Sequence, residues 1–220
     1  MGETRPMGNS FITAARVAFQ YLEEEFGLRI SKVQENERRP SSDAYIEYSS
    51  TSCVVALSAD RGAIVPPVVS RMADQGKYKH EGGLTLDRIC EYGRAKPQDV
   101  ARLSSRDFDE IKRAWQAVVE ENGRREYSMM MAAKAGRTDI TSEARLTVYA
   151  GLLREYGEPF LRGEFSTWLA LHEYNWHWLV AQEIVQDMRW GEELTFENIE
   201  KRFSNVREYL YALRKEYGRE

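Results

Sequence analysis

The residues whose types suit chemistry lie mainly in the segment 165–188, which reads FSTWLALHEYNWHWLVAQEIVQDM. His172 and His177 are five residues apart, so on a helix the second imidazole is turned about 140° from the first. The zinc pattern H-E-x-x-H needs two imidazoles one turn apart on the same face. We therefore expect no metal site, and a hydrogen-bonded core histidine is the default interpretation. Alternatively, His172 together with Trp168 and Trp176 lines an apolar pocket that binds a small ligand.

The other reactive side chains lack the patterns that activate them. Cys53 and Cys90 are isolated, and no C-x-x-C spacing is present that would lower the pKa of a thiol. The stretch His80-Glu81-Gly82-Gly83 lacks the lysine and the serine or threonine of a phosphate-binding loop. The sequence therefore predicts no catalytic residue and no cofactor, and it favours a non-catalytic role. An enzyme whose residues are scattered along the chain stays open.

Composition restricts the classes of protein to which the chain can belong. Its 220 residues are 42% hydrophobic and 30% charged, with a net charge of −4, which is typical of a soluble globular protein. General nucleic-acid binding is not expected, because it needs a concentrated basic surface. No apolar run reaches the roughly 20 residues of a membrane span. The start, MGETRPMGNS, lacks a hydrophobic signal region, and two isolated cysteines suit a reducing compartment, so we expect a cytoplasmic protein.

The candidate pocket residues require a helix that is buried on two sides. At helical spacing, Trp168 and Trp176 gather on one side of the segment 165–188, whereas Tyr174 and Trp178 gather on roughly the opposite side. A helix that is apolar on two sides packs between other elements. We predict that this segment is the central helix of the fold.

The first hundred residues have the pattern of a helix followed by strands. A first helix is expected from about Ser10 to Phe26, with Gly27 ending it, and a short extended piece follows at 28–33. Three strands are expected at 43–50, 52–59 and 63–70. Because Pro66 and Pro67 cannot donate to a ladder, the third strand should be an edge strand or should end there. The predicted unit is an N-terminal helix with a three-stranded antiparallel meander.

From Ser104 onward the sequence predicts helices, so the fold class is α+β with a mostly helical C-terminal bundle. The expected domains are 1–103 and 104–220, which can also form one continuous domain. A helix that begins near residue 141 should stop at Gly157, just before Pro159. The final helix, 196–217, carries apolar residues at alternating spacings of three and four. This seam suits packing within the bundle or self-association.

One further stretch could present a binding surface. Met129, Met130 and Met131 form either adaptable core or, if exposed, a surface for a partner protein. Arg124 and Arg125 would flank that surface or be solvated.

Part of the first hundred residues resembles a type of small bacterial protein. The pattern is a helix that ends in Phe26-Gly27, a strand with Tyr45, Glu47, Tyr48 and Ser49, a strand over 54–58 reading VVALS, and an Asp60-Arg61-Gly62 turn. Several proteins of this type are immunity-like partners encoded beside toxins. The resemblance implies a protein partner and transfers no catalytic residue.

Two functions therefore remain. The first is a cytoplasmic interaction protein, such as an immunity- or antitoxin-like partner or a subunit of an assembly. The second is a small-molecule-binding protein or enzyme with a pocket between the sheet unit and the Trp-rich helix near His172. The sequence favours the first, because no catalytic motif is present.

Overall fold

The computed structural model describes residues 7–35, 43–60, 63–78, 81–95, 97–118, 120, 142–185 and 195–219. Contacts divide the chain into two compact units. Unit 1 comprises Met1–Asp87 and Glu126–Glu164, and unit 2 comprises Arg88–Arg125 and Phe165–Glu220. This division differs from the expected boundary at residues 103 and 104, because a helix from the second half of the chain packs against the sheet of the first half.

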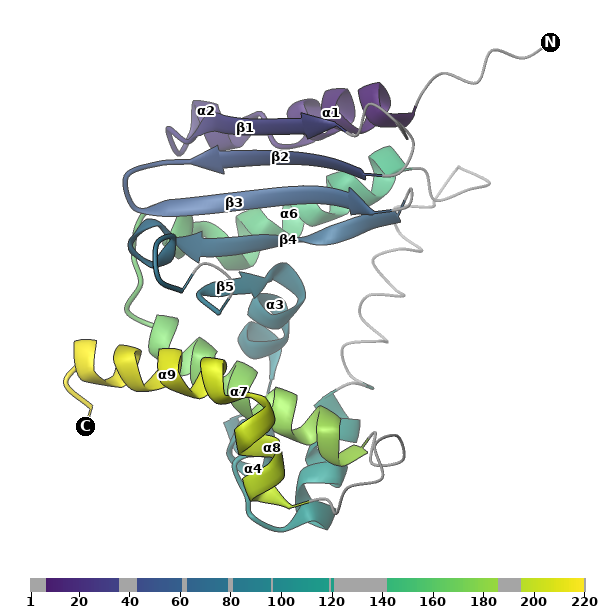
Figure 1. Cartoon of the computed structure of the whole chain (residues 1–220). Coiled ribbons are helices and arrows are strands. Elements are labelled where there is room, and N and C mark those ends of the chain that lie inside the picture. Colours follow the sequence, from purple (N-terminus) through teal and green to yellow (C-terminus); the bar gives the residue numbers. More distant parts are fainter. Residues whose placement is uncertain are drawn as a thin grey trace. The chain divides into compact units, whose positions relative to one another are not determined.

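Unit 1 is built on an antiparallel sheet in the strand order β1-β2-β3-β4-β5 (Figure 1). The strands are β1 Arg29–Glu35, β2 Asp43–Ser49, β3 Cys53–Asp60, β4 Ala63–Arg71 and β5 Gly83–Thr85. The α+β class is confirmed, but the expected three-stranded meander is too small. The extended piece after the first helix is a full strand paired with β2. The short β5, which the sequence did not predict, pairs with Val68, Val69 and Ser70.

The two prolines of β4 lie at a bulge. Ala56 is paired with Val68 and Ser58 with Val65, so Leu57 alone stands opposite Pro66 and Pro67. A bulge leaves the extra residue outside the ladder, which suits a residue without an N–H group. The prediction of an edge strand is wrong for the second half of β4, since β5 pairs with it beyond the prolines.

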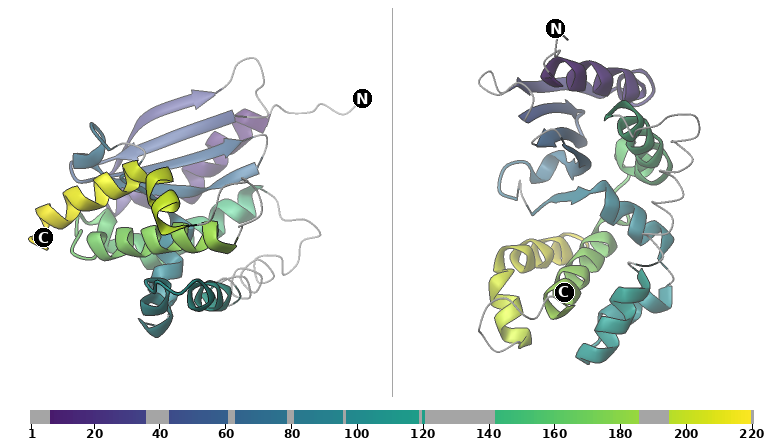
Figure 2. Two further views of the ribbon diagram at one scale, coloured as in Figure 1. Left: turned by 60° about the horizontal axis from the view of Figure 1, so that its bottom comes forward. Right: turned by 90° about the vertical axis from the view of Figure 1, so that its right-hand side faces the viewer.

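Helices α1, Met7–Ala18, and α6, Ser142–Leu161, pack on one face of this sheet (Figures 1 and 2). The expected first helix is interrupted after Ala18 and resumes as the short α2, Tyr21–Glu24. A 3-10 helix, η1, covers Met72–Asp74 after β4. The covered face of the sheet carries fully buried side chains, among them Ile46, Tyr48, Val55, Leu57 and Val69.

Helix α6 continues past the position at which it was expected to stop. Pro159 lies inside the helix, near its end. Proline removes only one backbone donor there, and the turn is closed by Arg162 N–H to Glu158 O at 3.1 Å and Glu164 N–H to Pro159 O at 2.8 Å. The helix ends at Leu161, and Gly163, two residues further on, has a φ of +81°, the left-handed conformation that glycine adopts most readily. The continuation carries Leu161 and Arg162 to the end of the sheet.

Unit 2 is helical. Its elements are α3 Leu86–Arg94, which belongs to it from Arg88 onward, α4 Pro97–Leu103, a helical segment at 108–118, α7 Trp168–Val185, α8 Phe196–Arg202 and α9 Ser204–Glu216. The prediction that α7 is buried on two sides is confirmed. Trp168 donates a hydrogen bond to the Tyr209 hydroxyl of α9, whereas Tyr174 packs on Tyr92 of α3 and Trp178 on Trp115.

The expected helix over 196–217 is divided into α8 and α9 by a turn at Phe203, whose ψ is 32°. The turn lets the seam contact two parts of unit 2. Ile199 joins the core cluster that contains Ile111 and Ile184, whereas Tyr209 packs on His172. Because Ile199 and Leu213 are buried inside unit 2, less of the seam is available for self-association, which stays a prediction.

Replacing Tyr48 with phenylalanine is expected to leave the free energy of unfolding unchanged or to raise it by up to about 1 kcal/mol. Tyr48 is fully buried, and its hydroxyl has no hydrogen-bond partner among the described residues. Burial, with a contribution from the Glu23 charge, raises the pKa of Tyr48 to about 12. The matched control is Tyr21→Phe, which removes a hydrogen bond of 3.0 Å to Ala150 O and should cost about 0.5–1.5 kcal/mol. Urea unfolding of both variants measures the difference, and equal losses would contradict the assignment.

Candidate anion-binding pocket

A pocket of about 570 Å³ lies at one end of the sheet in unit 1. Its lining comes from three segments that are far apart in the sequence: the connection from α2 to β1, the turn between β2 and β3, and the end of α6. The lining residues are Glu25, Phe26, Gly27, Arg29, Ser49, Ser50, Thr51, Ser52, Leu161 and Arg162. The volume is that of an ordinary small-molecule site.

Local sequence fixes the shape of each of these segments. Gly27 has a φ of +67°, and this left-handed residue lets the chain leave α2 and enter β1. The turn between β2 and β3 is held by Ser50, whose hydroxyl accepts hydrogen bonds from the backbone N–H groups of Ser52 at 3.2 Å and Cys53 at 3.1 Å. A Cβ atom at Gly163 would lie 2.9 Å from Ser52 Oγ, so the end of α6 and this turn approach closely.

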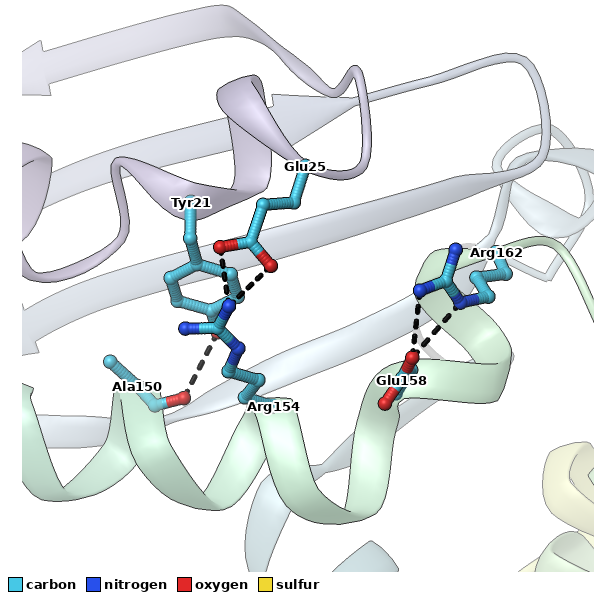
Figure 3. Close-up of polar contacts among 6 residues, drawn as sticks. All are labelled: Tyr21, Glu25, Ala150, Arg154, Glu158 and Arg162. Carbon is cyan, nitrogen blue, oxygen red and sulfur yellow. Dashed lines mark hydrogen bonds and ion pairs between the residues drawn. The ribbon is translucent and has the colours of Figure 1, made fainter.

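One wall next to the pocket contains Arg154 of α6 and Arg162, the residue that follows α6, each with its own carboxylate (Figure 3). Arg154 forms an ion pair with Glu25, and Arg162 donates from Nε and Nη2 to Glu158 Oε1 at 3.0 and 2.8 Å. Arg154 also lies over the ring of Tyr21, and Arg162 lies 5.1 Å from the ring centre of Phe26. These four charges are therefore neutralised in pairs.

The Tyr21 side chain connects α2 to the helix that carries Arg154. Its hydroxyl donates to Ala150 O at 3.0 Å and so ties α2 to α6 (Figure 3). Burial is the main cause that raises the pKa of Tyr21 above its ordinary value, and the nearby Arg154 acts in the opposite direction. Tyr21 is therefore a neutral structural residue at physiological pH.

Three polar groups of the lining remain available to a ligand. Within the part of the chain that the structure describes, the side chains of Arg29, Ser49 and Thr51 form no hydrogen bond and no ion pair. The hydroxyls of Ser50 and Ser52, by contrast, lie 3.2 Å apart and belong to the turn itself. The rim of the pocket thus has one exposed cation and two hydroxyl groups, and the paired residues Arg29 and Ser49 lie on the sheet face opposite to the one that α6 covers.

This set of groups is suited to holding a negatively charged group. An arginine presents a rigid fork of N–H donors that matches planar anions, and hydroxyl groups add single donors. Neither histidine nor cysteine is among the lining residues that the structure describes. The chemistry that the lining supports is therefore recognition of an anion.

The residues that the sequence nominated for ligand binding lie in unit 2. His172 is 2% exposed, and its ring stands edge-on to Trp168 and Tyr209, with 4.8 Å between ring centres in both pairs. Trp176 is half-buried and lies edge-on to Phe203. The structure brings Trp168 and His172 together, as expected from their spacing. None of the three lines the pocket in unit 1, and ligand binding by them stays a prediction.

The nominated partner surface cannot be placed. Met129, Met130, Met131, Arg124 and Arg125 lie outside the described residues.

The remaining reactive groups are buried or dispersed. Cys53 and Cys90 are both buried, and burial raises the pKa of the Cys53 thiol. Among the described ranges, no group of three or more His, Cys, Asp or Glu side chains is arranged to hold a metal ion. In the same ranges, no helix has the length and apolar character needed to cross a membrane.

Only some of the segments that line this pocket could be recognised from the sequence. The run Ser49-Ser50-Thr51-Ser52 lies where the predicted strands 43–50 and 52–59 meet, and Gly27 was predicted to end a helix. Nothing in the spacing linked either feature to Arg29 or to Leu161 and Arg162, because they meet only when α6 packs against the sheet.

Comparison with family models, curated proteins and solved structures gives no match.

Proposed function

We propose that this chain is a binding protein that holds a small organic anion in the pocket of unit 1. The observation that carries the proposal is the lining itself, in which Arg29 has no acidic partner among the described residues and lies with the hydroxyl-bearing side chains of Ser49 and Thr51. A bound anion would supply the missing partner. Arg29 is exposed, so an ion pair there contributes up to about 1 kcal/mol, and hydrogen bonds from the two hydroxyl groups would add to it.

The rest of the lining is consistent with an organic ligand rather than a bare ion. Phe26 and Leu161 provide apolar surface, and the volume of about 570 Å³ far exceeds that of an inorganic anion. This role corresponds to the small-molecule alternative from the sequence, with the pocket at the end of the sheet instead of near His172.

The test is a thermal-shift screen of the full chain against small carboxylates and organic phosphates, with calorimetry on every hit. A ligand at 100 times its dissociation constant adds about 2.7 kcal/mol to the stability of the folded state. Arg29→Gln should weaken binding of a hit by about three- to tenfold, since an ion pair of an exposed arginine contributes about 1 kcal/mol and 1.4 kcal/mol corresponds to a factor of ten. Lys32→Gln is the matched control, because Lys32 is an exposed cation of the same strand outside the pocket. Equal affinities for both variants would reject the pocket.

A second candidate is the protein-interaction role, with an immunity-like partner and a cytoplasmic location. The observation in its favour is the second face of the sheet, on which Tyr45, Val65 and Val68 are half-buried. Co-purification from the native host tests this role. A stoichiometric partner that is lost on replacing Val65 with lysine supports it, and a chain that emerges alone counts against it.

A further inference from the structure

We propose that the edge strand β1 is a docking site for an extended partner segment in which acidic and apolar residues alternate. The partner would add one strand to the sheet, beside β1. The proposal goes beyond the anion pocket and does not depend on it, because the decisive side chains, Lys32 and Val33, are not part of the pocket lining.

The first argument is that one side of β1 is open to a further strand. β1 is the outermost strand of the sheet (Figure 1), and among the described residues only β2 pairs with it. Its exposed side chains are Arg29, Ser31, Lys32, Val33 and Gln34. The outward N–H and C=O groups of an edge strand can form a ladder with another chain. At the opposite edge, β5 already pairs with residues 68–70, and Pro66 and Pro67 cannot donate.

The second argument is the charge of β1 on the open face of the sheet. Arg29 is paired with Ser49. Beyond a register shift, Lys32 is paired with Glu47, so the two cations lie on the same face although they are three residues apart. In the described ranges, neither cation forms an ion pair. Directly opposite side chains of neighbouring strands are about 4.5–5.5 Å apart, where opposite charges attract, so an acidic residue of the partner fits this face.

The acid closest to these cations, Glu47, leaves Lys32 available to a partner. The Glu47 carboxylate accepts hydrogen bonds from the hydroxyls of Ser31 at 2.7 Å and Tyr45 at 2.6 Å. The ammonium group of Lys32 lies 5.7 Å from the ring centre of Tyr45. Because Glu47 belongs to β2, it is one strand further from a docked partner than Lys32 is. The partner's acidic side chain would therefore be closer to the cation than to the anion.

The third argument is the apolar surface on the other face of β1. Val33 is paired with Ile46 and Ile30 with Tyr48, and both residues of β2 are fully buried on the face that α1 and α6 cover. Val33 is nevertheless 41% exposed. An apolar residue of an added strand would pack against it. Since successive side chains of a strand point to opposite faces, the partner that fits both faces alternates acidic and apolar residues.

A second copy of this chain fits the same edge less well. Antiparallel pairing of two β1 strands about their middle residue places Lys32 opposite Lys32 of the copy, and like charges directly opposite each other are destabilising. A lysine and a bulge on an edge strand oppose pairing between identical chains. The same positive charge favours an acidic strand, so it selects among partners.

The test uses two synthetic peptides, acetyl-GEVEVEVG-amide and its charge-reversed control acetyl-GKVKVKVG-amide. Amide chemical shifts of the isotope-labelled full chain follow both titrations at pH 7 and low salt. We expect the acidic peptide to shift the amides of residues 29–34 and to bind about tenfold more tightly than the basic peptide. Equal or tighter binding of the basic peptide would overturn the proposal, and so would the absence of binding by both at millimolar concentration.

Two variants of the protein and one of the peptide separate charge from strand pairing. Lys32→Glu should reverse the preference between the peptides, whereas Lys201→Glu makes the same charge change at an exposed lysine of unit 2 and should leave it unchanged. The peptide acetyl-GEVEPEVG-amide keeps the charge but lacks one backbone donor, and it should bind about fivefold more weakly. Equal binding of the valine and proline peptides would mean attraction of charge without strand addition and would overturn the proposal.

Hydrogen exchange and sedimentation of the free chain test the other possible occupants of the edge. The amides of residues 29–34 that do not bond to β2 should exchange rapidly. Protection of all of them in a monomer would mean that another segment of this chain covers the edge. Protection that arises only in a dimer would mean that a second copy covers it. Either result would overturn the assignment of an acidic partner segment.

Discussion

Replacing Asp74 with alanine is expected to reduce the free energy of unfolding by about 3–5 kcal/mol. Asp74 accepts two hydrogen bonds from Arg71, Nε to Oδ2 at 2.8 Å and Nη2 to Oδ1 at 2.9 Å. The two side chains are only 8% and 6% exposed. Removal of the carboxylate leaves the guanidinium buried without its bidentate counter-ion, and that loss, rather than the strength of the pair, dominates the cost.

Urea unfolding followed by far-UV circular dichroism measures this loss. The control is Glu158→Ala, which removes the acid of the Arg162 pair, whose side chains are 54% and 46% exposed. Exposed pairs contribute between zero and about 1 kcal/mol, so the control should fall in that range. Arg71→Met combined with Asp74→Leu should recover much of the stability, since no unpaired charge remains. A loss for Asp74→Ala no greater than that of the control would contradict the prediction.

Replacing Trp168 with alanine should cost about 3–5 kcal/mol. The side chain is fully buried in unit 2, edge-on to the rings of Phe165 at 5.3 Å and His172 at 4.8 Å between ring centres. Its indole N–H donates to the Tyr209 hydroxyl at 3.1 Å, which joins α7 to α9. The substitution therefore removes the packing of a large ring. It also removes the hydrogen bond that the buried Tyr209 hydroxyl accepts.

Two further variants separate these effects. Trp168→Phe keeps an aromatic ring but removes the indole N–H group, and it should cost less than the alanine variant. Tyr211→Ala is the surface control, because Tyr211 lies on α9 with 66% of its side chain exposed and should change stability by no more than about 0.5 kcal/mol. Chemical unfolding with a circular dichroism readout compares the three. A small loss for Trp168→Ala would mean that α7 is not packed on α9 in solution.

Local patterns predicted the elements that depend on neighbouring residues. The β-branched run over 53–57 and the alternation around Ile46 and Tyr48 gave β3 and β2, and the two-sided distribution of aromatic residues predicted the packing of α7. Elements that depend on distant contacts were missed. β5 is three residues long and exists because it pairs with β4, and α6 passes Pro159 because a proline in the last turn removes only one donor.

The features of the candidate pocket also fall into those that local sequence determines and those that depend on distant contacts. The sequence by itself determined that residues 49–52 form a hydroxyl-rich turn and that Gly27 ends a helix, because serine and glycine act on the backbone within a few residues. Only the tertiary structure decided that Arg29, this turn and the end of α6 line one cavity, since residues more than a hundred positions apart meet through packing of α6 on the sheet. Periodicity records which side of an element is apolar, whereas the position of a charged side chain next to a cavity depends on which elements pack together.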